Sequence, residues 1–94
     1  MSISKGKIIW VDDEIELLRP HIIFLQERGY DITPVTNAED AILLIQQNSY
    51  DIILLDEMLN GMDGLTALYK IKEITSSLPV IMINPPVLSR GATW

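Results

Sequence analysis

Three short apolar runs set the framework of the chain. Residues 8–11, 52–55 and 80–83 are β-branched or bulky, and they do not alternate with polar residues. Continuous apolar runs of this length are typical of strands buried on both faces of a parallel sheet. Each run is therefore predicted to be a buried parallel strand.

Between the first two runs, apolar residues recur every three or four positions. These positions are Ile15, Leu18, Ile22 and Leu25. The spacing predicts an amphipathic helix over residues 14–28, closed by Gly29. Pro20 lies inside this segment, where a proline removes a backbone hydrogen bond and clashes with the preceding turn, so we expect a kink or a late helix start.

A further strand and helix are predicted before the second run. Residues 31–35 read as a strand that carries Pro34, and a proline is tolerated mainly at the edge of a sheet. Asn37 is the predicted N-cap of the following helix, with Glu39 and Asp40 in its first turn. Its inward face is expected to comprise Ala38, Ala41, Ile42 and Ile45.

A third helix is predicted after Gly64. Its expected inward residues are Leu65, Leu68 and Ile71, and its mostly outward residues are Lys70, Lys72 and Glu73. The alternation of strands and helices predicts an α/β fold with a doubly wound parallel sheet, in which ligands bind at the carboxyl ends of the strands. The pattern stops at Asn84, so we divide the chain into a domain over 1–84 and an irregular tail over 85–94.

The composition fits one globular domain, and its acidic balance suits cations or basic partners better than nucleic acid. The 94 residues are 48% hydrophobic and 21% charged, and the net charge of −6 argues against a nucleic-acid-binding surface. The absence of cysteine excludes disulfides, thiolate zinc sites and cysteine nucleophiles. No apolar run is long enough to be a signal-peptide core or to cross a bilayer, so we predict a cytoplasmic protein without membrane contact.

Three aspartates follow predicted strands. Asp12 and Asp13 come directly after residues 8–11, and Asp56 comes directly after residues 52–55. Because the carboxyl ends of parallel strands share one edge, we expect these carboxylates to converge. A hard divalent cation would relieve their repulsion, and a site with few carboxylates and several waters suits Mg²⁺. Asp56 could then attack a phosphoryl group as a nucleophile; the alternative is that each acid only ends a strand or caps a helix.

Three motifs follow one another around these aspartates. The first, residues 8–14, is a strand followed by an acidic pair. The second, residues 51–64, is a strand with its following loop, and the third, residues 78–83, is a further strand. In this order and spacing they resemble the receiver domains of bacterial two-component response regulators, over residues 7 to about 83. The resemblance implies a flavodoxin-like fold with strand order 2-1-3-4-5 and a signalling role, not an enzymatic one. Trp10 and the segment Arg19-Pro20-His21 also resemble receivers attached to PglZ-type effector domains.

The resemblance implies a role for each matched residue. Asp56 would be the phosphoacceptor, Asp13 a direct Mg²⁺ ligand, Asp12 a ligand through water, and the backbone carbonyl of Met58 a further ligand. The donor would be a phosphohistidine on a histidine kinase or phosphotransfer protein. His21, the single histidine of this chain, is expected to be an ordinary surface or packing residue.

The chain also departs from the family. Asn84 stands where a Ser or Thr hydroxyl bonds the phosphoryl group and couples it to a conformational switch, and Asn60 replaces the usual proline of the loop. The family continues with two helices and a lysine-bearing fifth strand that residues 85–94 do not match, and no output domain is present. We therefore expect an incomplete receiver whose exposed fourth strand favours a homodimer or domain-swapped oligomer, unless the apolar residues of the tail cover the gap.

Two functions remain open from the sequence. The first is a phosphoacceptor domain whose phosphorylation changes partner binding. The second is an interaction or dimerisation module that keeps the receiver fold without switching, which Asn84 and the absence of a lysine after Lys72 favour. A phosphohydrolase fits less well, because such enzymes typically place two aspartates one residue apart, whereas Asp12 and Asp13 are adjacent.

Overall fold

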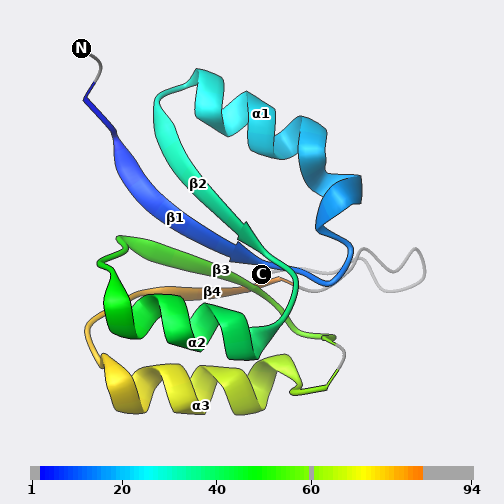
Figure 1. The fold of residues 1–94 in the computed structure, drawn as a ribbon, viewed down its shortest axis with the longest axis vertical. Coiled ribbons are helices and arrows are strands. Elements are labelled where there is room, and N and C mark those ends of the chain that lie inside the picture. Colours follow the sequence, from blue (N-terminus) through cyan, green and yellow to red (C-terminus); the bar gives the residue numbers. More distant parts are fainter. Residues whose placement is uncertain (1–2, 60, 84–94) are drawn as a thin grey trace.

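The computed structural model describes residues 3–59 and 61–83. Its elements are β1 (Gly6–Val11), the 3-10 helix η1 (Ile15–Leu18), α1 (Arg19–Glu27), β2 (Tyr30–Val35), α2 (Ala38–Gln47), β3 (Ile52–Asp56), α3 (Gly64–Ile74) and β4 (Val80–Ile83). The strands form one parallel sheet in the order β2-β1-β3-β4 (Figure 1), as predicted. Asn60, Asn84 and the predicted tail lie outside the described residues. None of the helices in the described ranges combines the length and the hydrophobicity that a membrane span requires.

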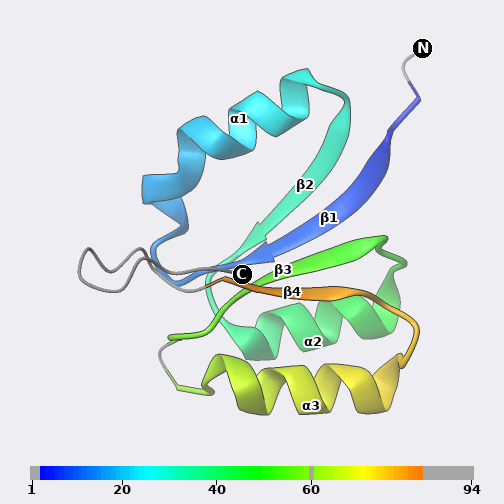
Figure 2. The same cartoon turned by 180° about the vertical axis from the view of Figure 1, so that it is seen from behind.

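The sheet separates two apolar cores. Helix α1 lies on one face, and α2 and α3 lie on the other (Figures 1 and 2). Along β1, Ile9 and Val11 pack in the core under α2 and α3, whereas Ile8 and Trp10 pack in the core under α1. The unalternating apolar run is explained by this division, because both faces of the strand are covered.

The strand β4 is less buried than the run at 80–83 predicts. It pairs with β3 and forms the edge of the described sheet, and Ile81 is 48% exposed. At the opposite edge lies β2, where Pro34 is paired in register with Trp10. The predicted edge position of the proline strand is therefore confirmed. Proline has no backbone N–H to donate, and on the outer side of an edge strand there is no neighbouring strand that would need one.

The first predicted helix is divided in two. The short helix η1 ends before Arg19, and Pro20 lies in the first turn of α1. A proline is well tolerated there, because its missing N–H would have no partner within the helix. Gly29, at a φ of 101°, follows the end of α1. The late helix start is therefore confirmed, and His21 is exposed on α1 as expected.

Helix α2 begins as predicted. The Asn37 side chain accepts a hydrogen bond of 2.8 Å from the backbone N–H of Asp40, which caps the helix. Ala38, Ala41 and Ile45 are buried, and Ile42 packs against the same core. The inward face of α2 is therefore the predicted one.

The inward face of α3 differs from its prediction at one position. Ile71 is buried as expected, but Leu65 is 54% exposed and Ala67 is fully buried in its place. Small residues face the sheet near the start of α3, which brings its backbone close to the neighbouring strand end. Lys72, predicted to point mostly outward, is half-buried and donates a hydrogen bond of 2.6 Å to the carbonyl of Leu78, which ties the end of α3 to the loop before β4.

Candidate magnesium and phosphoacceptor site

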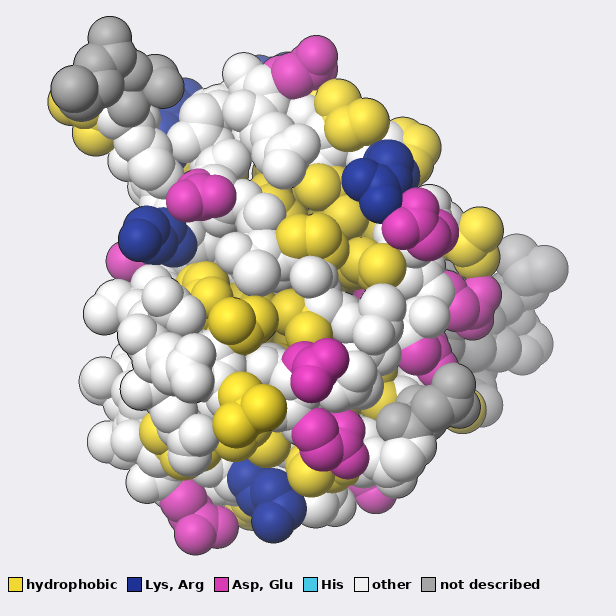
Figure 3. All heavy atoms as spheres, viewed as in Figure 1, with side chains coloured by type: hydrophobic (Ala, Val, Ile, Leu, Met, Phe, Trp, Pro, Cys, Tyr) yellow, Lys and Arg dark blue, Asp and Glu magenta, His cyan; other side chains and the backbone are white. Residues whose placement is uncertain are grey.

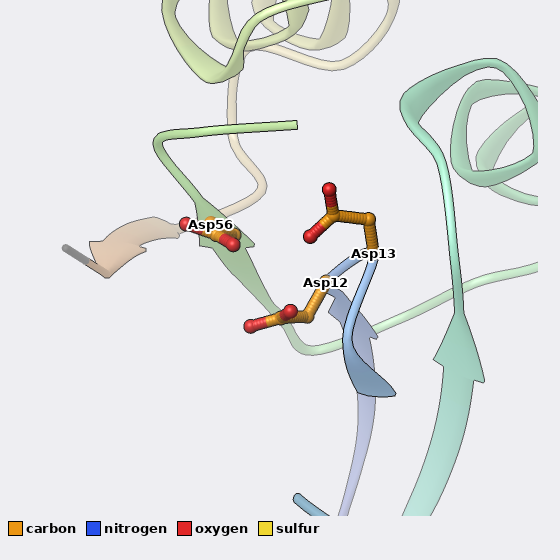
Figure 4. Close-up of side chains that lie close together, drawn as sticks. All are labelled: Asp12, Asp13 and Asp56. Carbon is orange, nitrogen blue, oxygen red and sulfur yellow. The ribbon is translucent and has the colours of Figure 1, made fainter. Parts of the chain in front are cut away.

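The carboxyl ends of β1 and β3 bring three aspartates together. One carboxylate oxygen from each of Asp12, Asp13 and Asp56 lies within 4.8 Å of the other two, and the side chains project into the same space (Figure 4). Parallel pairing matches Val11 with Leu55, so the residues that follow the two strands emerge side by side. The predicted convergence of these residues, which we call the acidic trio, is confirmed.

Asp56 has the most enclosed carboxylate of the trio. It is the last residue of β3 and is 8% exposed, and its Oδ1 accepts a hydrogen bond of 3.0 Å from the backbone N–H of Met58. Burial raises the pKa of Asp56, the Met58 N–H opposes this shift, and the charges of Asp12 and Asp13 raise the pKa further. The folded chain thus disfavours the ionised form of Asp56 until a positive charge compensates it.

The acidic pair after β1 is held by backbone hydrogen bonds. The N–H of Asp12 donates to the carbonyl of Val35 at 3.0 Å, and Oδ1 of Asp12 accepts from the N–H of Glu14 at 2.8 Å. These bonds join the loop after β1 to the end of β2 and orient the Asp12 carboxylate. Asp12 and Asp13 are both half-buried, so their carboxylates remain accessible to an ion from solvent.

The connection from β3 to α3 packs directly against Asp56. The N–H of Gly64 donates to the carbonyl of Glu57 at 3.0 Å. A Cβ at position 64 would lie 2.5 Å from the carbonyl oxygen of Asp56 and 2.7 Å from the Cα of Glu57, so only glycine fits there. The sequence predicted Gly64 only as the residue before the third helix, whereas it is the first residue of α3 in the structure. The available signal was a glycine inside the first turn of a helix, a position at which it lowers helix propensity.

The comparison with known sequences decides the family. The response regulator receiver domain family matches residues 8–85 of the chain. The chain belongs to this family. Two similar proteins of Bacillus subtilis (strain 168) are the uncharacterized transcriptional regulatory protein YkoG, 32% identical, and the transcriptional regulatory protein ResD, 36% identical, each over 81 residues. The receiver domain aligns over 86% of its own length with both, but over 36% of YkoG and 33% of ResD, so it spans about a third of these relatives.

Solved structures agree with the assignment. The receiver domain of Francisella response regulator 1452 superposes with a TM-score of 0.78 at 28% identity, over 85% of this chain and 66% of that one. A two-component response regulator from Clostridium difficile superposes with a TM-score of 0.76 at 33% identity, over 83% and 64%. The predicted receiver resemblance and flavodoxin-like fold are thus confirmed, while the resemblance to PglZ-type receivers stays a prediction.

The charge of the receiver domain is concentrated around the acidic trio. Acidic residues at the carboxyl edge of the sheet and in the first helical turns beside it are Asp12, Asp13, Glu14, Glu16, Glu39, Asp40, Asp56, Glu57 and Asp63. Among the described basic residues, Arg19 lies at this edge, where it pairs with Glu16 at 2.8 Å. The others, toward the opposite edge, are Lys5, Lys7, Arg28, Lys70 and Lys72. Acidic side chains gather on the side where α2 and α3 begin (Figure 3). Negative charge is stabilising there, because the N-terminus of a helix carries partial positive charge. The carboxyl edge of the sheet therefore carries a negative potential, which attracts positive charge.

Proposed function

We propose that the receiver domain accepts a phosphoryl group on Asp56, with Mg²⁺ bound at the acidic trio. The donor would be a phosphohistidine of a histidine kinase or a phosphotransfer protein. The observation that supports this proposal is the convergence of three carboxylates, one of them buried and held by a backbone N–H, at the edge where ligands bind in parallel α/β sheets.

The residues of the trio fit a magnesium ion. Three carboxylate oxygens within 4.8 Å of one another are close enough to surround one cation, and oxygen is the ligand that Mg²⁺ prefers. We assign Asp13 and Asp56 as direct ligands, Asp12 as a ligand through water, and the backbone carbonyl of Met58 as a further ligand. When bound, Mg²⁺ supplies positive charge that compensates the carboxylates and the incoming phosphoryl oxygens.

Asp56 then acts as the nucleophile. A carboxylate oxygen forms a bond to phosphorus while the bond from phosphorus to the imidazole nitrogen of the donor breaks, and its electron pair returns to the imidazole. The N–H of Met58 holds Oδ1 of Asp56, so the carboxylate has a fixed orientation before the donor arrives. Asp56 attacks in its ionised form. The pKa of Asp56 is raised in the folded chain, and the positive charge of a bound Mg²⁺ would counter this shift.

Beryllofluoride, a mimic of the phosphoryl group, tests this proposal. Trp10 is 8% exposed in β1, two residues before Asp12, so its fluorescence should respond when beryllofluoride binds with Mg²⁺. Trp94 is replaced by Phe in every variant so that Trp10 is the single reporter. Asp56→Asn should abolish the response, and Asp51→Asn, which changes the aspartate just before the same strand, should keep it. An unchanged spectrum in the chain with Asp56 intact would contradict the proposal.

A second candidate is an interaction module that binds partners without switching. Asn84 favours it, because an amide is larger than the Ser or Thr hydroxyl of the family and does not reproduce its movement. The two candidates differ in the extent of the response to beryllofluoride. Amide NMR shifts limited to residues next to Asp56 would support the second candidate, whereas shifts that extend through β4 would support the first.

A further inference from the structure

A groove of about 340 Å³ lies next to the acidic trio, between the start of the β3–α3 connection and the exposed side of α3. Its lining residues are Glu57, Met58, Asp63, Leu65, Thr66 and Tyr69. We call it the β3–α3 groove. Its position relative to Asp56 is fixed, because Gly64 packs against the backbone of Asp56 and Glu57.

The groove exposes three large apolar side chains. Met58 is 68% exposed, Leu65 54% and Tyr69 66%. Leu65 and Tyr69 are four residues apart on α3, so they lie one above the other on the same side of the helix. Single exposed apolar residues are common, but an adjacent group that lines a concave surface is typical of a binding site. The proposed phosphoacceptor chemistry uses none of these side chains.

Carboxylates border this apolar surface. Glu57 and Asp63 are both exposed, and neither forms an ion pair with a described residue. Asp63 caps α3 through a 2.8 Å hydrogen bond from the N–H of Thr66, which lowers the pKa of Asp63 and keeps it ionised. The groove therefore combines an apolar floor with two negative charges, inside the negative field around the acidic trio.

We propose that the β3–α3 groove binds a basic amphipathic helix of a partner protein. The apolar side of such a helix would cover Met58, Leu65 and Tyr69, and its lysine or arginine side chains would meet Glu57 and Asp63. Charge complementarity selects this occupant. A second copy of this chain carries an excess of acidic residues, so it matches the groove less well than a basic segment does. The proposal does not depend on phosphorylation of Asp56.

The test uses a 14-residue synthetic helix of leucine and lysine with all leucines on one side, titrated into the 94-residue chain while amide NMR shifts are followed. Shifts should centre on the groove residues. Leu65→Ser and Tyr69→Ser should each weaken binding by about tenfold, because each removes an apolar contact. Leu43→Ser is the matched control, since Leu43 on α2 is also 54% exposed but does not line the groove.

Charge provides a second set of controls. Raising the salt concentration to about 1 M should weaken binding, and a peptide with glutamate in place of lysine should not bind. Asp56→Asn should leave the affinity for the leucine–lysine peptide within about twofold, since Asp56 does not line the groove. A failure of the phosphoacceptor proposal therefore leaves this result intact, and the reverse also holds.

Three results would overturn the proposal. The first is that the leucine–lysine peptide does not bind. The second is that Leu43→Ser weakens binding as much as Leu65→Ser does, which would show nonspecific association with exposed leucines. The third is a concentration-dependent dimer in sedimentation velocity that Leu65→Ser abolishes, which would assign the groove to a second copy of the chain.

Discussion

The substitution Asp56→Asn should stabilise the fold in the absence of divalent ions. Asn keeps the shape of the side chain and an oxygen that accepts the Met58 N–H, but it removes the negative charge of the most buried carboxylate in the acidic trio. The repulsion from Asp12 and Asp13 and the desolvation of that charge disappear together. The fold is therefore relieved of an unfavourable interaction that is absent from the unfolded chain.

The distances in the trio set the size of the effect. Two unit charges 4.8 Å apart repel by about 0.9 kcal/mol in water and about 3.5 kcal/mol at an effective dielectric constant of 20. Asp12 and Asp13 are half-buried and partly screened by solvent, and the neutral amide accepts a weaker hydrogen bond from Met58. We expect a net gain of about 1–2 kcal/mol in the free energy of unfolding. For a domain of this size, each kcal/mol raises Tm by about 4–8 °C.

Urea unfolding followed by far-ultraviolet circular dichroism measures this gain, at neutral pH and low salt with EDTA. Asp51→Asn is the control, because Asp51 precedes β3 and accepts a hydrogen bond of 2.7 Å from the N–H of Lys7. It should not stabilise the fold. Adding Mg²⁺ at about 100 times its dissociation constant should stabilise the unaltered chain by about 2.7 kcal/mol and Asp56→Asn by much less.

Two outcomes would refute the reasoning. If Asp56→Asn is no more stable than the unaltered chain in EDTA, the three carboxylates do not repel one another as the distances require. If Mg²⁺ stabilises both chains equally, the ion binds without Asp56.

Three further predictions follow from other contacts. Burial and neighbouring charge raise the pKa of Asp56 above 3.8, so the folded chain binds that proton more tightly than the unfolded chain does. The stability of the unaltered chain relative to Asp56→Asn, measured by urea unfolding, should therefore fall as pH rises from about 4 towards neutrality. A rise in this relative stability would contradict the raised pKa. Gly64→Ala should destabilise the fold by about 1–3 kcal/mol in thermal unfolding, whereas Gly6→Ala, whose Cβ meets nothing nearer than 3.6 Å, should change stability little. Asn37→Ala should lose about 1 kcal/mol by removing the α2 cap, measured by urea unfolding, and Asn48→Ala at the other end should lose less; equal losses would argue against the cap.

Local patterns were sufficient for much of the fold. A proline in a strand predicted the edge position of β2, and Asn37 was correctly identified as a helix cap, because both effects act within a few residues. The meeting of Asp12 and Asp13 with Asp56 could also be predicted, although more than 40 residues lie between them. The carboxyl ends of parallel strands lie at one edge of the sheet, so this convergence can be predicted without knowing the individual contacts.

The chain itself carries the order of strands and helices, the strand runs and the carboxylates of the candidate site, because the hydrophobic period and the strand ends can be read directly from the residues. Other features depend on packing between segments that are distant in the sequence. The folded structure was needed to show that Leu65 is exposed, that position 64 has no room for a side chain and that a groove lies beside the acidic trio. The spacing of hydrophobic residues locates the buried face of a helix only to within a turn. The close approach of α3 to the end of β3 depends instead on the shapes of both segments.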